Sequence, residues 1–164
     1  MRILGAVLVF LLAGALMVPG AQARSPEDIA RRALERAPVW DGHNDVPIQL
    51  RGRFANMIGD FDFEDTTNTG GPPEDGTWKG RVMHTDLARL RKGRVGAQFW
   101  SVYVSAALPE AQAVQATLEQ IDVTQRLIAR YPADLAGARS ADDVARAKAE
   151  GRIASLMGIE GGHA

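Results

Sequence analysis

The sequence lacks cysteine and any marked excess of charge, and both absences narrow its possible roles. Without cysteine, no disulfide framework can stabilise the fold, and no lipid can be attached to a cysteine after an N-terminal leader. The 19 basic residues nearly balance the 20 acidic ones, and the formal net charge is −1. This balance gives no support for a nucleic-acid partner or for binding to an anionic membrane surface. Stability must therefore come from a packed core or from a bound metal.

Several sequence motifs are missing as well. The chain has no Gly-x-Ser-x-Gly elbow, no P-loop and no Gly-x-Gly-x-x-Gly turn, so acyl-serine and nucleotide chemistry have no support. No repeat with a period of about 20 to 50 residues is visible. Hydrophobic residues make up 46% of the chain, which is ordinary for a globular protein. The length of 164 residues suggests a single domain.

Residues 1–23 are predicted to form a signal peptide. The basic Arg2 is followed by an apolar run over residues 3–18, a Pro-Gly break, and the small-x-small pattern of residues 21–23. A membrane anchor is the alternative, but the run is shorter than the ~20 apolar residues that span a bilayer. We therefore expect a bacterial protein that is exported to the periplasm or secreted, with residues 24–164 as its folded part.

Alternating helical and strand patterns follow the leader. Helices are expected at 25–37, 86–91, 109–131 and 140–150, and most are bounded by capping residues or by a helix-ending proline or glycine. Strands are expected at 39–45, which runs into a glycine turn, and at 96–104, 135–138 and 152–160. The acidic stretch 59–80 lacks the ligand spacing of a calcium loop and is interpreted as a surface or active-site loop. The alternation predicts an α/β protein with a parallel sheet or barrel.

Two of the expected helices carry an apolar stripe that should face the core. The stripe of the first helix consists of Ile29, Ala33, Leu34 and Ala37. The stripe of the longest helix consists of Val114, Leu118, Ile121 and Ile128. Both sets recur at the spacing of a single helical face.

His43 and Asp45 form the first candidate site. Side chains two positions apart on a strand point to the same side, so the imidazole and the carboxylate can approach one metal ion such as Zn²⁺. On spacing alone, the commoner explanation is a histidine that donates a hydrogen bond to a nearby aspartate in a turn. Position favours function, because α/β barrels keep their chemistry at the carboxyl ends of their strands.

Glu160 favours the metal site over a simple hydrogen bond between His43 and Asp45. It ends another apolar strand, just before two glycines, and a carboxylate buried there without a partner would be costly. A metal or a buried base would explain it. In a barrel, the strand ends that carry His43, Asp45 and Glu160 would face one another, which favours a metal site built from these three residues.

Two further histidines are interpreted as structural. His84 or its neighbour Thr85 is expected to cap the short helix that follows, with Asp86 favouring the helix N-terminus. His163 lies three residues after Glu160, but the intervening glycines argue against a helical HExxH-type site. His163 is therefore expected to support the site without binding a metal.

Four stretches together resemble the renal (membrane) dipeptidases and their bacterial relatives. They are DGHNDVP (41–47), HTDLARLRKGRVGAQFWSVYV (84–104), TLEQIDVTQRLIARYP (117–132) and GRIASLMGIEGGH (151–163). They occur in the order and spacing of that family, and they cover most of the chain after the leader.

The resemblance implies a TIM-like (β/α)8 metal-dependent hydrolase barrel that cleaves dipeptides with two Zn²⁺ ions. Carried over to this sequence, His43 and Asp45 bind one ion, and Glu160 bridges both. The ion pair would hold a hydroxide and polarise the scissile carbonyl. The implied partner is a dipeptide substrate, with no nucleic acid, and the full-length protein could form a homodimer.

This sequence departs from the family pattern at its C-terminal end. The further histidine ligands, the substrate-binding histidine and the acid/base aspartate of the family all follow the EGGH motif, so no catalytic residue is assigned in this chain. A complete barrel needs about 250 residues. We therefore expect the truncated N-terminal portion of such a barrel, about three strands, inactive alone. The alternatives are a non-catalytic short product, or another amidohydrolase-like metal-dependent hydrolase that cleaves a cyclic amide or ester.

Overall fold

The structure is a computed structural model that describes residues 24–59, 61–70 and 80–163. The predicted signal peptide and the middle of the acidic loop, residues 71–79, lie outside the described residues. Within the described ranges, no helix combines the length and apolarity that crossing a membrane would require.

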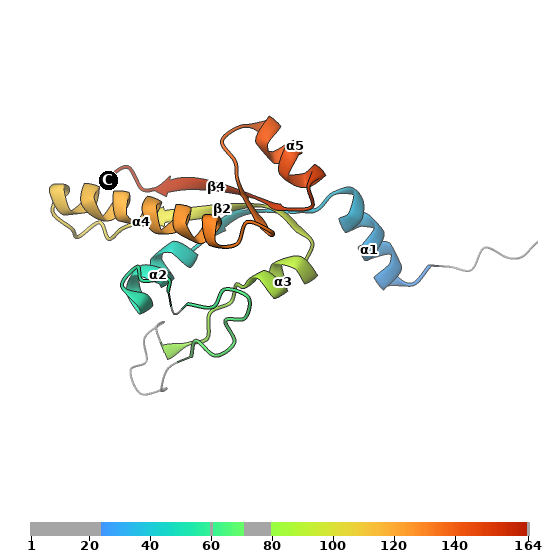
Figure 1. The fold of residues 1–164 in the computed structure, drawn as a ribbon, viewed down its shortest axis with the longest axis horizontal. Helices are drawn as coiled ribbons and strands as arrows, with labels where there is room; N and C mark the ends of the chain where they lie inside the picture. The colour runs from blue at the N-terminus through green and yellow to red at the C-terminus, as the bar shows by residue number, and fades with distance from the viewer. Residues whose placement is uncertain (1–23, 60, 71–79, 164) are drawn as a thin grey trace, which may run out of the picture.

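A parallel sheet of four strands forms the centre of the fold (Figure 1). The strands are β1 (Val39–Asn44), β2 (Val95–Tyr103), β3 (Leu135–Gly137) and β4 (Ile153–Glu160). Their order across the sheet is β1-β2-β4-β3, and every neighbouring pair is parallel. The predicted α/β class with a parallel sheet is confirmed. All four strands expected from the sequence are present, and the short β3 pairs with the first residues of β4.

Five helices are described alongside the sheet: α1 (Pro26–Arg36), α2 (Val46–Phe54), α3 (Leu87–Lys92), α4 (Glu110–Arg130) and α5 (Ala141–Ala149). Helix α2 was not predicted. The sequence suggested a glycine turn near Gly42, but β1 continues to Asn44 and α2 begins two residues later. Pro47 lies in the first turn of α2, where its missing N–H costs nothing, and the Asn44 side chain accepts a hydrogen bond from the Val46 N–H.

Helix caps follow the local sequence closely. Ser25 accepts a hydrogen bond from the Asp28 N–H at the start of α1, and Ser140 forms a capping box with Asp143 at the start of α5. The expected cap of α3 was wrong. Neither His84 nor Thr85 caps that helix, because the Asp86 carboxylate itself accepts the hydrogen bond from the Arg89 N–H.

The two faces of the sheet are covered by different helices. Trp100 on β2 packs in a large cluster with residues of α2, α3 and α4, whereas Ala97 of the same strand packs with Ala147 of α5. Ala97 and Trp100 are an odd number of positions apart, so their side chains point to opposite faces. Helix α5 accordingly lies on the other side of the sheet from α2 and α3 (Figure 1).

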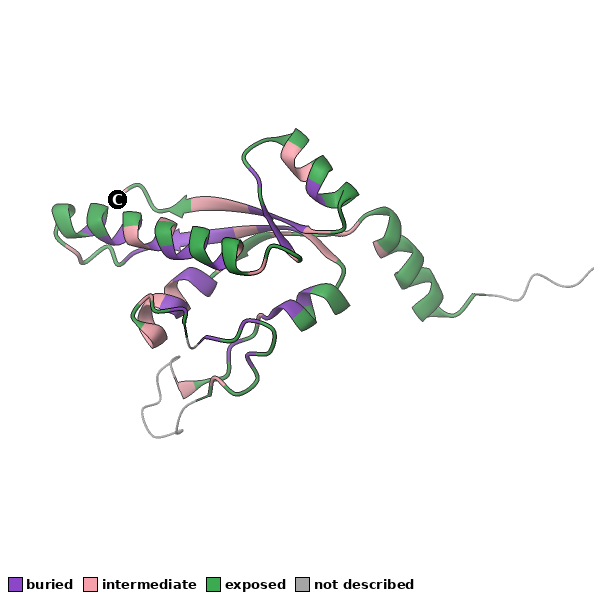
Figure 2. Cartoon of the chain, in the orientation of Figure 1, coloured by how far each residue is buried: buried purple, intermediate pink, exposed green. Residues whose placement is uncertain are grey.

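The apolar stripes of α1 and α4 are only partly buried, although Ile128 of α4 packs against the core. In α4, Val114 and Leu118 are exposed, Leu118 by 61%, and α1 has no buried residue (Figure 2). The buried face of α4 consists instead of Ala113, Ala116, Thr117, Gln120, Val123, Thr124 and Leu127.

Two threonines explain how a partly polar face of α4 can be buried. The hydroxyls of Thr117 and Thr124 donate to backbone carbonyls one turn earlier in the same helix, at Ala113 and Gln120. Their hydrogen-bonding capacity is thereby met without water. The small alanine side chains let the helix approach the sheet. Side-chain volume therefore determines which face of α4 is buried more than side-chain hydrophobicity does.

Candidate metal centre

The candidate site lies at the carboxyl edge of the sheet. His43 is the penultimate residue of β1, Asp45 follows directly as the N-cap residue of α2, and Glu160 is the last residue of β4. Strand β2 lies between β1 and β4. Because the three strands are parallel, their carboxyl ends meet at the same edge, and residues more than 100 positions apart become neighbours.

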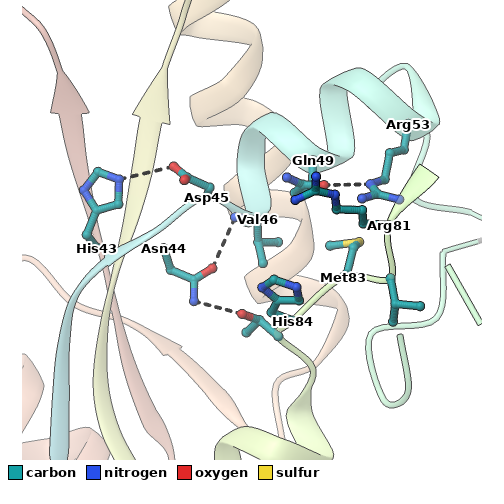
Figure 3. A pocket seen from close by; sticks show the side chains of 11 residues that line it. His43, Asn44, Asp45, Val46, Gln49, Arg53, Arg81, Met83 and His84 are labelled. Atoms are coloured by element: carbon teal, nitrogen blue, oxygen red, sulfur yellow. Dashed lines mark hydrogen bonds and ion pairs between the residues drawn. The ribbon is translucent and has the colours of Figure 1, made fainter. Parts of the chain in front are cut away.

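The side chains of His43, Asp45 and Glu160 converge on one point. The Nε2 atom of His43 lies 3.2 Å from Oδ1 of Asp45 and 3.4 Å from Oε2 of Glu160. One potential ligand atom from each residue lies within 4.8 Å of the others. Figure 3 shows the His43 ring and the Asp45 carboxylate pointing toward one another. The structure thus brings together all three residues that the sequence singled out.

The spacing of these atoms fits a metal ion. Two ligands bound at about 2.05 Å in a tetrahedral arrangement are about 3.3 Å apart, which matches both contacts of His43 Nε2. The 3.2 Å contact with Asp45 alone would equally suit a simple hydrogen bond. Glu160 favours a metal ion over a simple hydrogen bond. A second carboxylate near the same nitrogen adds negative charge that one histidine does not balance.

Charge around the cluster favours a cation. Among the ion pairs of the described residues, neither Asp45 nor Glu160 is paired with a lysine or arginine, and their contact with His43 counts as an ion pair only when that ring is protonated. All three side chains are about half exposed, so an ion can reach them from solvent. One nitrogen and two carboxylate oxygens are ligands that Zn²⁺ accepts.

A polar network behind β1 orients the site. Asp41 accepts a hydrogen bond from the His43 N–H at 3.1 Å, and the Asn44 amide donates to Thr85 Oγ1 at 3.1 Å. The buried Gln98 of β2 lies at the limit of hydrogen-bond distance from the same amide. Sequence reasoning missed this network. The signal was present as a lone glutamine in the apolar strand GAQFWSVYV.

Two cavities open on the cluster. One of about 300 Å³ is lined by His43, Asp45, Gln49, Arg81 and His84, among others (Figure 3). The second, of about 260 Å³, lies between β1, β2 and β4 and is lined by residues that include His43, Ser101 and Glu160. A small ligand can therefore approach His43 from either side.

His163 does not join the cluster. One of its ring nitrogens lies 3.0 Å from the backbone carbonyl of Val104, a contact that ties the segment after β4 to the end of β2. Gly161 is required for this approach, because its φ is +85° and a Cβ at that position would lie 2.6 Å from the His163 ring. The histidine therefore supports the backbone after Glu160, as expected.

A parallel α/β sheet with a cluster of polar side chains at its carboxyl edge is typical of α/β barrel proteins, and this cluster is suited to a metal. The comparison with protein families is more specific. The family model of the membrane dipeptidases, peptidase family M19, matches residues 27–164, and the chain belongs to this family. The family is one of metallopeptidases, so metal dependence is expected of its members.

Individual relatives agree with this assignment. The dipeptidase verJ of Clonostachys rogersoniana is 38% identical over 144 residues, which cover 82% of this chain and 34% of that protein. The chain therefore spans about a third of the length of this relative.

Two solved structures show the same fold. A metallopeptidase of Rhodobacter sphaeroides, bound to a phosphinate mimic of the dipeptide L-Ala-D-Ala, matches with a TM-score of 0.57 at 21% identity. A family M19 metallopeptidase, the dipeptidase AC, matches with a TM-score of 0.56 at 23% identity. The matches cover 77% of this chain and 38% and 37% of those chains, so the sheet corresponds to part of a barrel fold.

Proposed function

We propose that the protein is a metal-dependent dipeptidase whose Zn²⁺ site includes His43, Asp45 and Glu160. The observation that carries this proposal is the convergence of the three side chains from two separate strand ends, with His43 Nε2 facing both carboxylates. Family membership and a relative described as a dipeptidase support the substrate class. The neighbour bound to a mimic of L-Ala-D-Ala supports a dipeptide-sized ligand.

Each residue has a definite task in this proposal. The His43 ring would supply a nitrogen ligand through Nε2, and Asp45 would supply the first negative charge. Glu160 would supply a second carboxylate, whose Oε2 faces His43, and the resemblance to the dipeptidases implies that this carboxylate is shared by two ions. When bound, the ions would lower the pKa of a water molecule and polarise the scissile carbonyl.

The proposal includes export. The pattern of residues 1–23 supports a cleaved signal peptide, and a protein without cysteine needs no oxidising compartment to fold. A periplasmic or secreted dipeptidase would meet peptides outside the cytoplasm.

The test combines metal binding with hydrolysis. Zn²⁺ bound per chain is measured by equilibrium dialysis, and release of alanine from L-Ala-L-Ala and L-Ala-D-Ala is followed for the full-length protein and for its His43→Ala variant. His84→Ala is the matched control, because His84 is also exposed and lines the same cavity without joining the cluster. We expect His43→Ala to abolish hydrolysis and to weaken Zn²⁺ binding, and His84→Ala to retain Zn²⁺ binding. Full activity in His43→Ala would refute the metal assignment.

A further inference from the structure

We infer that Ser101 is a positioning residue that fixes the carboxylate of Glu160 for the metal centre. Ser101 lies on β2, is only 4% exposed, and donates a hydrogen bond from Oγ to Oε2 of Glu160 at 2.7 Å. This inference rests on the proposed function, because it concerns how a ligand of that centre is held.

The register of the sheet makes this contact possible. The residue directly opposite Ser101 on β4 is Gly158, whereas Glu160 lies opposite Tyr103. Ser101 therefore reaches Glu160 diagonally, over a position that has no side chain.

The hydrogen bond selects one orientation of a mobile side chain. Glu160 is exposed at the end of a strand and has three rotatable side-chain bonds, so it would otherwise sample several rotamers. Ser101 holds the same oxygen that lies 3.4 Å from His43 Nε2. A carboxylate oxygen has two lone pairs, so Oε2 can accept the hydrogen bond from the serine hydroxyl and still bind a cation. Supporting hydrogen bonds of this kind typically contribute 10–100-fold to metal affinity.

Another buried serine shows what a purely structural role looks like. Ser155 on β4 is 2% exposed, and its hydroxyl donates to the backbone carbonyl of Ile153 in its own strand. No described hydrogen bond joins Ser155 to the cluster. Ser155→Ala therefore removes a buried hydroxyl of the same size without touching the proposed centre.

The experiment uses Co²⁺ alone as the probe, because its visible absorption reports the ligand geometry of a site that also accepts Zn²⁺. Co²⁺ is titrated into the wild-type protein and into Ser101→Ala, Ser101→Thr, Ser101→Val and Ser155→Ala, and thermal unfolding without metal is recorded for each. Threonine and valine have nearly the same shape and both suit a strand, but only threonine keeps the hydroxyl. This pair decides the question even if Ser101→Ala does not fold.

We expect Ser101→Ala and Ser101→Val to weaken Co²⁺ binding by about 10-fold or more and to change the visible spectrum. Ser101→Thr should restore affinity to within about 3-fold of wild type, and Ser155→Ala should leave both affinity and spectrum unchanged. Equal affinity in the threonine and valine variants would overturn the inference while leaving the centre intact. Equal losses at Ser101 and Ser155, in step with lower unfolding temperatures, would also overturn it. Absence of Co²⁺ binding by the wild-type protein would overturn the proposed centre and this inference together.

Discussion

The two edges of the sheet differ in how their charged side chains are paired. At the amino edge, before β2, β3 and β4 begin, acids and bases neutralise one another. Arg91 bridges Glu64 and Asp134, and Arg152 pairs with Glu150. At the carboxyl edge, two carboxylates share one histidine. Opposite charges placed together stabilise a fold modestly, whereas like charges placed together are costly unless a cation joins them.

This difference separates residues that hold the fold from the residues of the proposed metal centre. The pKa of Arg91 is raised by its hydrogen bonds to Asp134 and Glu64, which shows how fully this cation is engaged. Among the ion pairs of the described residues, no lysine or arginine pairs with Asp45 or Glu160. Four predictions test this difference between the two edges of the sheet.

The largest effect is expected at the carboxyl edge. Glu160→Gln removes one negative charge from the cluster and should weaken Zn²⁺ binding by more than about 100-fold, the upper end of what loss of a merely supporting contact causes. Stability without metal should hold or rise, because a like-charge contact with Asp45 is relieved. Glu150→Gln is the control at the amino edge and should bind Zn²⁺ normally. Equal Zn²⁺ affinities in the two variants, measured by competition with a chelator, would contradict the contrast.

A buried and fully paired carboxylate provides the second comparison. Asp86 is buried and caps α3. Its carboxylate pairs with the Arg89 guanidinium and accepts a hydrogen bond from the Thr66 N–H. Asp86→Ala should lower the free energy of unfolding by about 2–3 kcal/mol, from loss of a cap and from leaving its donors unsatisfied. Urea denaturation measures this loss, and a change below about 0.5 kcal/mol would show that the network adds little.

The third change is in pH. Burial opposes ionisation of Asp86, but hydrogen bonds from the side chain and backbone of Arg89 and from Thr66 outweigh it, so the pKa of Asp86 is lowered. The ionised form is thus favoured in the folded state. Its stabilisation is complete above the unfolded pKa of about 4 and is lost as pH falls through the lower folded-state value. Urea midpoints from pH 7 to pH 2 should fall less steeply below pH 4 in Asp86→Asn than in wild type. Parallel curves would mean that other groups dominate acid unfolding.

The smallest effect is expected from the amino edge. Arg91→Gln breaks two exposed ion pairs and should cost about 0.5–1 kcal/mol in low salt, less in 1 M NaCl because of screening. Zn²⁺ affinity should not change. A loss of Zn²⁺ binding in this variant would show that the two edges are coupled.

Local features were predictable from the sequence because neighbouring residues decide them. The caps at Ser25 and Ser140 and the ends of most strands depend on side chains within a few positions, and the structure confirms them. His43, Asp45 and Glu160 could be selected because each lies at the end of a predicted strand.

Features decided by distant contacts could not be predicted. The buried face of α4 depends on the volume available above the sheet, so Leu118 is exposed while Thr117 is buried. Helix α2 depends on hydrogen bonds of Asn44 that follow from its place beside β2 and Thr85. The contact between Ser101 and Glu160 depends on strand register, which places Gly158 opposite the serine.

The most direct test of the metal centre is X-ray diffraction from crystals grown with Zn²⁺, recorded at wavelengths on both sides of the zinc absorption edge. We expect an anomalous peak about 2.0–2.2 Å from Nε2 of His43 and from carboxylate oxygens of Asp45 and Glu160. In the same crystals, Ser101 Oγ should remain hydrogen-bonded to Glu160. A zinc ion bound by other residues, or no anomalous peak at the carboxyl edge of the sheet with Zn²⁺ in excess, would contradict the proposed metal centre.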